Sequence, residues 1–102
     1  MESPVVRFAE AVRALGSEAR RAGLRMPGFR SPPRLRGVDR SLRRRSDGGA
    51  TIAVVVRGRP WAAVVADMVE GVLVANRLSG AAADRARAKL WQAVGGDETA
   101  AA

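Results

Sequence analysis

The chain has 102 residues, no cysteine and no histidine, and a formal net charge of +8. The length predicts one small domain, and the lack of cysteine excludes disulfides, thiolate nucleophiles and cysteine-held zinc. No apolar run is long enough to span a bilayer and no secretory signal is recognisable, so we expect a cytoplasmic protein.

Positive charge is concentrated in residues 20–45. This segment holds ten of the 17 arginines against one aspartate, a net charge of +9, so the rest of the chain sums to −1. Seventeen arginines against a single lysine indicate a GC-rich bacterial genome, but that bias does not by itself produce such an asymmetry. A cluster of one sign repels itself and costs stability. Binding a polyanion offsets this cost, because each neutralised phosphate releases a counterion.

Residues 4–22 are predicted to form an amphipathic helix. Apolar side chains recur there at alternating spacings of three and four, which gives one apolar stripe. Ser3 is the expected N-cap, and Pro4 suits the first helical position. Gly23 suits the left-handed position that ends a helix, with Leu24 making the accompanying hydrophobic contact.

Residues 25–37 contain three prolines and two glycines among several arginines. This composition excludes a helix and predicts a semi-rigid connector laid over the surface. Phe29, inside the connector, is the better candidate for stacking on a nucleic-acid base. Trp61 and Trp91 each lie in a predicted helix and are expected to anchor the core.

Residues 38–45 and 50–57 are predicted to be two strands joined by a turn at Ser46–Gly49. A three-residue loop places Val38 and Leu42 on the same face as Ile52, whereas a two-residue loop separates them, so the three-residue register is favoured. The second strand is apolar on both faces and therefore needs covering twice, by helices or by a second copy.

Two helices are predicted after the strands. Gly58 breaks the strand, and Pro60 suits the start of a helix over 60–78. Because that helix is apolar nearly all round, we expect it to be sandwiched in a core shared with a partner, as in a homodimer. A last helix covers 81–94, and residues 96–102 are expected to be a flexible tail. The prediction is therefore a single α+β domain, residues 1–95, with the order α-β-β-α-α.

An arginine-bearing two-stranded ribbon fits the major groove of DNA, where guanidinium groups contact phosphates or guanine edges. The competing interpretation is a charged edge strand that discourages aggregation. The predicted nucleic-acid-binding residues are the arginines of the connector, the first strand and the following corner: Arg30, Arg34, Arg36, Arg40, Arg43, Arg44, Arg45, Arg57 and Arg59. Arg20, Arg21 and Arg25 are expected to assist them.

Other motifs have simpler explanations. The segment Arg57–Pro60 resembles the core of the AT-hook, a minor-groove motif, but a strand-to-helix corner explains its glycine and proline. Asp67 and Glu70 lie one helical turn apart, which a solvated stripe explains better than a metal site. The last two helices resemble a helix-turn-helix only weakly, because neither has a strongly basic recognition face.

Enzymatic activity is not expected. The chain lacks histidine, cysteine and tyrosine, and no phosphate-binding glycine loop is present, so no catalytic constellation, cofactor or metal is predicted. The favoured function is a small, basic, non-enzymatic bacterial protein that binds duplex DNA and is associated with the nucleoid. The alternatives are an RNA-binding or ribosome-associated factor and, in another class, a protein-interaction module that docks an acidic protein partner.

Overall fold

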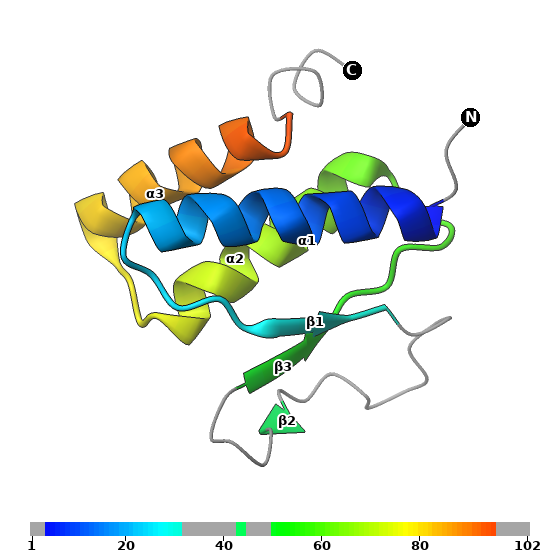
Figure 1. The fold of residues 1–102 in the computed structure, drawn as a ribbon, viewed down its shortest axis with the longest axis horizontal. Coiled ribbons are helices and arrows are strands. Elements are labelled where there is room, and N and C mark those ends of the chain that lie inside the picture. Colours follow the sequence, from blue (N-terminus) through cyan, green and yellow to red (C-terminus); the bar gives the residue numbers. More distant parts are fainter. Residues whose placement is uncertain (1–3, 32–42, 45–49, 96–102) are drawn as a thin grey trace.

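Three helices and three short strands make up the part of the chain that the computed structural model describes, residues 4–31, 43–44 and 50–95 (Figure 1). In chain order they are α1 (Pro4–Arg21), β1 (Gly28–Arg30), β2 (Arg43–Arg44), β3 (Ala50–Ala53), α2 (Trp61–Ala75) and α3 (Gly80–Ala93). This is a small α+β domain, and the predicted order of α-β-β-α-α is confirmed, with one strand more than expected.

The predicted hairpin is present as β2 and β3, which pair antiparallel. Arg43 lies opposite Thr51, and Arg44 opposite Ala50. This is the register that a three-residue loop produces, whereas a two-residue loop would shift the pairing by one residue. The loop itself, 45–49, lies outside the described residues. The requirement that apolar residues of both strands share one face therefore predicted the register.

The prediction of a connector without regular structure was wrong for residues 28–30, which form β1. This strand runs parallel to β3, with Phe29 opposite Ile52, and gives the sheet the order β1-β3-β2. The ladder continues one bond further, because the Val54 N–H donates to the Arg30 carbonyl oxygen at 2.9 Å. No proline falls within 28–30, so each of its nitrogens retains a hydrogen. The pairing is non-local, and the local sequence pattern does not reveal it.

The end of α1 follows the sequence prediction closely. Gly23 has a φ of +74°, in the left-handed region. Its N–H donates to the Arg20 carbonyl oxygen at 3.1 Å, and the Leu24 N–H donates to the Ala19 carbonyl oxygen at 2.8 Å. These two bonds form a Schellman motif, with Leu24 packed against the core. Glycine is used here because the turn requires a positive φ.

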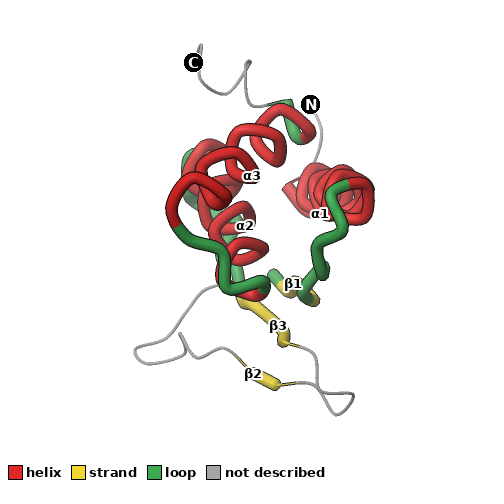
Figure 2. Tube along the Cα trace, turned by 90° about the vertical axis from the view of Figure 1, so that its left-hand side faces the viewer, coloured by secondary structure: helices red, strands yellow, loops and turns green. Residues whose placement is uncertain are grey.

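Helix α2 lies at the centre of the domain and contacts both α1 and α3 (Figure 2). Its buried residues form one broad face: Val64, Val65, Met68, Val69, Gly71, Val72 and Leu73. Phe29 and Ile52 of the sheet approach it at Gly71. Of its large apolar residues only Val74 is well exposed, so one chain buries most of the apolar surface of this helix, and the exposed side also carries Asp67 and Glu70. The apolar surface of this helix is therefore no longer a reason to expect a dimer, and the homodimer stays a prediction.

The helices and the sheet form two parts of unequal size. Figure 2 shows β1 beside the helices and β2 farthest from them, so the sheet extends away from the helical body. Val54 and Val56, which follow β3, are buried, whereas Thr51 and Ala53 are partly exposed. Within β3, Ile52 is likewise only partly buried, so full burial begins after the strand, at Val54.

The corner between β3 and α2 is built as the sequence indicates. Gly58 has a φ of +77°, and Pro60 immediately precedes the helix. Helix α2 ends at Ala75, three residues earlier than predicted, because Asn76 and Arg77 already form the turn into α3. Within residues 4–31, 43–44 and 50–95, no helix combines the length and the hydrophobicity needed to cross a membrane.

Candidate nucleic-acid interface

The described residues include five of the nine predicted nucleic-acid-binding arginines. Arg30 lies on β1, Arg43 and Arg44 on β2, and Arg57 and Arg59 in the corner before α2. The other four lie outside the described residues: Arg34, Arg36, Arg40 and Arg45.

The sheet brings two arginine positions to one face. Residues directly opposite each other in a ladder share a face, and neighbours along a strand alternate between faces. Phe29 and Ile52 pack towards Gly71 of α2, so the residues on either side of them belong to the opposite face. That face includes the positions of Arg30, paired with Ala53, and of Arg43, paired with Thr51.

The position of Arg44 belongs to the other face of the sheet, the face towards α2, because Arg44 pairs with Ala50, two residues before Ile52. The consecutive arginines of β2 therefore do not share one face. The ribbon therefore cannot direct both of these arginines at a single duplex from one face. The edge position of β2, farthest from the helices in Figure 2, leaves the strand at the margin of the molecule.

Arg59 is held inside the corner. Its Nη1 donates to the Val55 carbonyl oxygen at 3.0 Å and to Asp67 Oδ2 at 2.7 Å. These bonds tie the corner to the first half of α2, and the side chain is only 31% exposed. The sequence favoured a corner over an AT-hook, and this geometry gives Arg59 a structural role. Arg57, by contrast, is exposed.

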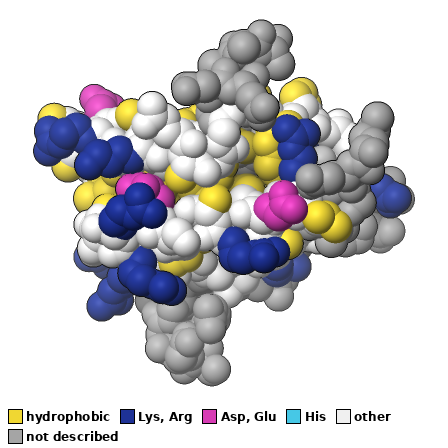
Figure 3. Space-filling model, turned by 45° about the horizontal axis from the view of Figure 1, so that its top comes forward, with side chains coloured by type: hydrophobic (Ala, Val, Ile, Leu, Met, Phe, Trp, Pro, Cys, Tyr) yellow, Lys and Arg dark blue, Asp and Glu magenta, His cyan; other side chains and the backbone are white. Residues whose placement is uncertain are grey.

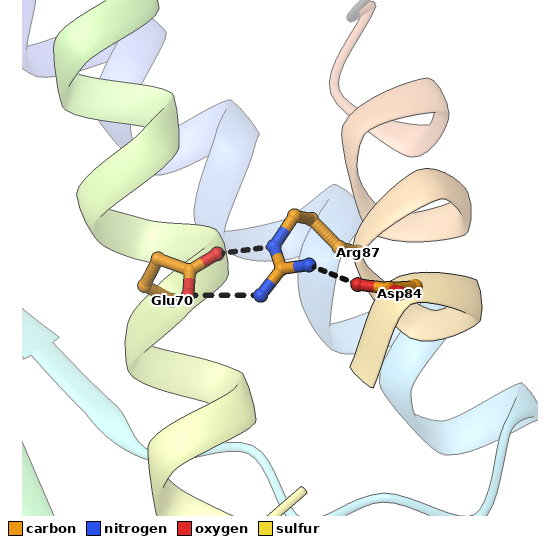
Figure 4. Close-up of polar contacts among 3 residues, drawn as sticks. All are labelled: Glu70, Asp84 and Arg87. Carbon is orange, nitrogen blue, oxygen red and sulfur yellow. Dashed lines mark hydrogen bonds and ion pairs between the residues drawn. The ribbon is translucent and has the colours of Figure 1, made fainter. Parts of the chain in front are cut away.

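The acidic residues of α2 are each paired with an arginine from another element. Arg87 of α3 donates from Nε to Glu70 Oε2 at 2.6 Å and from Nη2 to Glu70 Oε1 at 3.3 Å, while its Nη1 donates to Asp84 Oδ1 at 2.8 Å (Figure 4). The hydrogen bond with Glu70 is the main cause that raises the pKa of Arg87 above its ordinary value. Asp67 pairs with Arg59. In the described part of the chain, no three potential metal-ligating side chains gather.

The surface of the helices carries charges of both signs. Figure 3 shows acidic side chains interspersed with Lys and Arg on one face of the molecule. Such a mixed surface attracts a polyanion less than a segment of one sign does. Segment 20–45 therefore differs from the helices that follow it in carrying charge almost entirely of one sign.

The aromatic residues serve the core. Trp61, Trp91 and Phe29 are partly buried and pack against the buried cluster, so the prediction that the tryptophans anchor the core is confirmed. The guanidinium of Arg7 lies 4.4 Å from the centre of the Trp61 ring, a cation–π contact. The Phe29 ring faces Gly71, and this packing argues against its predicted role in base stacking.

Sequence reasoning missed Asn76, which follows α2. Its Oδ1 accepts a hydrogen bond from the Arg25 backbone N–H at 2.8 Å. Its Nδ2 donates to the Arg25 carbonyl oxygen at 2.8 Å and to the Val72 carbonyl oxygen at 2.8 Å. The side chain thus joins the segment before β1 to the end of α2. An asparagine after a helix is a common turn residue, so the pattern carries no signal for this long-range contact.

Comparisons with known proteins found no relative: no family model, no curated protein and no solved structure matches the chain. The described fold defines the chain as a small α+β domain.

Proposed function

We propose that this protein binds nucleic acid, with duplex DNA favoured over RNA, and that it catalyses no reaction. The observation that carries the proposal is the charge asymmetry of the sequence: a net +9 in residues 20–45 against −1 in all the others. Phosphate contacts by arginine supply most of the affinity of non-specific DNA binding. We propose a place in the bacterial cytoplasm, in association with the nucleoid.

The arrangement of the described arginines supports this proposal. Arg59 and Arg87, both outside the basic segment, form ion pairs with acidic residues of α2. Arg30 and Arg43, both inside the segment, lie at positions on the sheet face opposite α2. A strand that projects beyond the helical body is suited to a groove of DNA, because the body does not obstruct the duplex.

The experiment measures binding of the full chain to a fluorescently labelled duplex of about two helical turns across a salt series. With about four phosphate contacts per subunit, log K should fall against log salt with a slope of about −3.6. Changing Arg43, Arg44 and Arg45 together to Gln should flatten that slope by about 1.8. Neighbouring positions on a strand alternate between faces, so about two of the three can contact one duplex, and each lost contact removes about 0.9. The thermal stability of this variant should stay equal or rise slightly, because repulsion between like charges falls.

The matched controls are Arg13→Gln on α1 and Arg85→Gln on α3, two exposed positions outside the segment. Arg87 is unsuitable as a control because it joins α3 to Glu70. Equal weakening by the controls and the triple variant would refute the special role of the segment. Structured RNA in place of the duplex tests the RNA alternative, which predicts tighter binding to RNA. An acidic protein partner predicts no saturable binding to either nucleic acid at moderate salt.

A further inference from the structure

Arg77 has an unusual backbone conformation. Its φ is +53°, in the left-handed region, whereas every other described residue with a positive φ is a glycine: Gly23, Gly58, Gly80 and Gly95. Arg77 occupies the same place after α2 that Gly23 occupies after α1. Its N–H donates to the Val74 carbonyl oxygen at 3.0 Å, and the Leu78 N–H donates to the Leu73 carbonyl oxygen at 3.0 Å. These bonds again form a Schellman motif.

A side chain at such a position strains the backbone, because its Cβ crowds the following carbonyl oxygen. Glycine would relieve this strain, and the chain uses glycine at the equivalent turn after α1. Strained residues are concentrated at functional positions, so an observed outlier is a reason to look for a role. Arg77 is exposed, and no described residue accepts a hydrogen bond or forms an ion pair with its guanidinium.

The Asn76 side chain joins the segment that carries Arg25 to the segment that carries Arg77. The Asn76 amide makes one hydrogen bond to the backbone N–H of Arg25 and one to its carbonyl oxygen, each at 2.8 Å. Arg77 is the next residue after Asn76, so the Asn76 amide joins the backbone of Arg25 to the residue before Arg77. The Arg25 side chain is also exposed and has no partner among the described residues. Arg25 and Asn76 are 51 residues apart in the sequence. A third hydrogen bond, from Asn76 Nδ2 to the Val72 carbonyl oxygen, holds the Asn76 side chain in place.

The surroundings of this pair are basic in sequence. Residues 19–31 contain four arginines and no acid, and residues 71–80 contain Arg77 and no acid. Arg25 also leads directly into β1, whose last residue is Arg30. The two arginines therefore continue the basic segment from the sheet towards the helices. A surface of one sign on two neighbouring backbone segments matches the regular negative charge of a phosphate backbone.

We propose that Arg25 and Arg77 form a second phosphate contact, separate from the arginines of the sheet, and that Asn76 is the positioning residue that holds them together. This inference rests on the proposed function. Arg77 is retained in a strained conformation because its guanidinium binds a phosphate that glycine would leave uncontacted.

The test uses the full chain and the same labelled duplex DNA. Arg77→Gly should have two effects of opposite sign. The melting temperature should rise by roughly 4 °C, because the strain at this position is removed. DNA binding should weaken, and the salt slope should flatten by about 0.9, because one phosphate contact is lost. A double change, Arg25→Gln with Arg77→Gly, should flatten the slope by about 1.8.

Arg77→Lys keeps the charge and the strain, and should keep the slope of the wild-type protein. Arg13→Gln on α1 is the control for loss of a surface charge and should change the slope little. If the wild-type protein binds the duplex but the double variant has the slope of the control, this inference is overturned and the proposed function stands. If the wild-type protein shows no salt-dependent binding, the proposed function fails and the inference fails with it.

Discussion

The contact between Gly71 of α2 and the sheet gives a sharp test of the packing. A Cβ at position 71 would lie 2.7 Å from Ile52 Cδ1 and 3.2 Å from Phe29 Cε1. Alanine is a better helix former than glycine by about 1 kcal/mol. An extra methyl group forced into a packed core costs about 1–3 kcal/mol. We therefore expect Gly71→Ala to lower the free energy of unfolding by about 1 kcal/mol, as the balance of these two effects.

Removing Ile52 Cδ1, the atom nearest to the added Cβ, should reverse the effect of Gly71→Ala on the free energy of unfolding. Ile52→Val deletes Cδ1, and alone it should cost about 1 kcal/mol. In the Ile52→Val background, Gly71→Ala should instead raise the free energy of unfolding by up to about 1 kcal/mol, because the helix-forming advantage of alanine remains. The two changes thus have a coupling energy of about 1–2 kcal/mol, within the range for residues in contact.

Gly16 of α1 is the matched control, because it is also a helical glycine but a Cβ there would meet nothing within 4 Å. Gly16→Ala should therefore raise the free energy of unfolding by about 1 kcal/mol. The assay is urea denaturation followed by circular dichroism and by tryptophan fluorescence. If Gly71→Ala stabilises the wild-type protein as much as it stabilises the Ile52→Val variant, the proposed contact between β3 and α2 is wrong.

Two further outcomes are expected. Asn76→Ala removes three hydrogen bonds to backbone groups and should lower the free energy of unfolding by about 1–3 kcal/mol in urea denaturation; an unchanged midpoint would contradict the joining role of this side chain. Glu70→Gln should lower the melting temperature slightly, and by the same amount at about pH 6 and about pH 9. The pKa of Arg87 is raised in the folded state, so its contribution is complete below the ordinary pKa of arginine and is lost only at much higher pH. A clear difference between the two pH values would refute this assignment.

The sequence predicted the elements whose signals are local. The apolar stripe and the glycine after α1 defined that helix, because a helix end is determined by the residues beside it. The hairpin register followed from the requirement that Val38, Leu42 and Ile52 share a face, and the pairing of Arg43 with Thr51 confirms it. Local periodicity and turn chemistry were sufficient for these elements.

The elements that the sequence did not reveal depend on distant partners. Strand β1 exists because β3, more than 20 residues later, offers it a parallel neighbour. The role of Asn76 depends on Arg25, 51 residues earlier. For the candidate site, the sequence indicated the basic segment from charge alone. It did not indicate that Arg30 and Arg43 share a sheet face, because that arrangement requires both the parallel and the antiparallel pairing.

The composition of α2 has a consequence for the unfolded chain. Five of its 15 residues are valine, a β-branched residue that forms helices poorly and strands well. An isolated helix of this length is marginal in water even with better helix formers. The surrounding helices and sheet therefore keep this segment helical.

When the domain opens, the short apolar stretch Val72–Ala75 is released, and its valines favour strands, through which such stretches associate with one another. The exposed edge of the sheet is protected in a different way, because β2 carries two arginines. The central helix is therefore prone to aggregation in the unfolded chain, and the folded state prevents that aggregation by burying its apolar face.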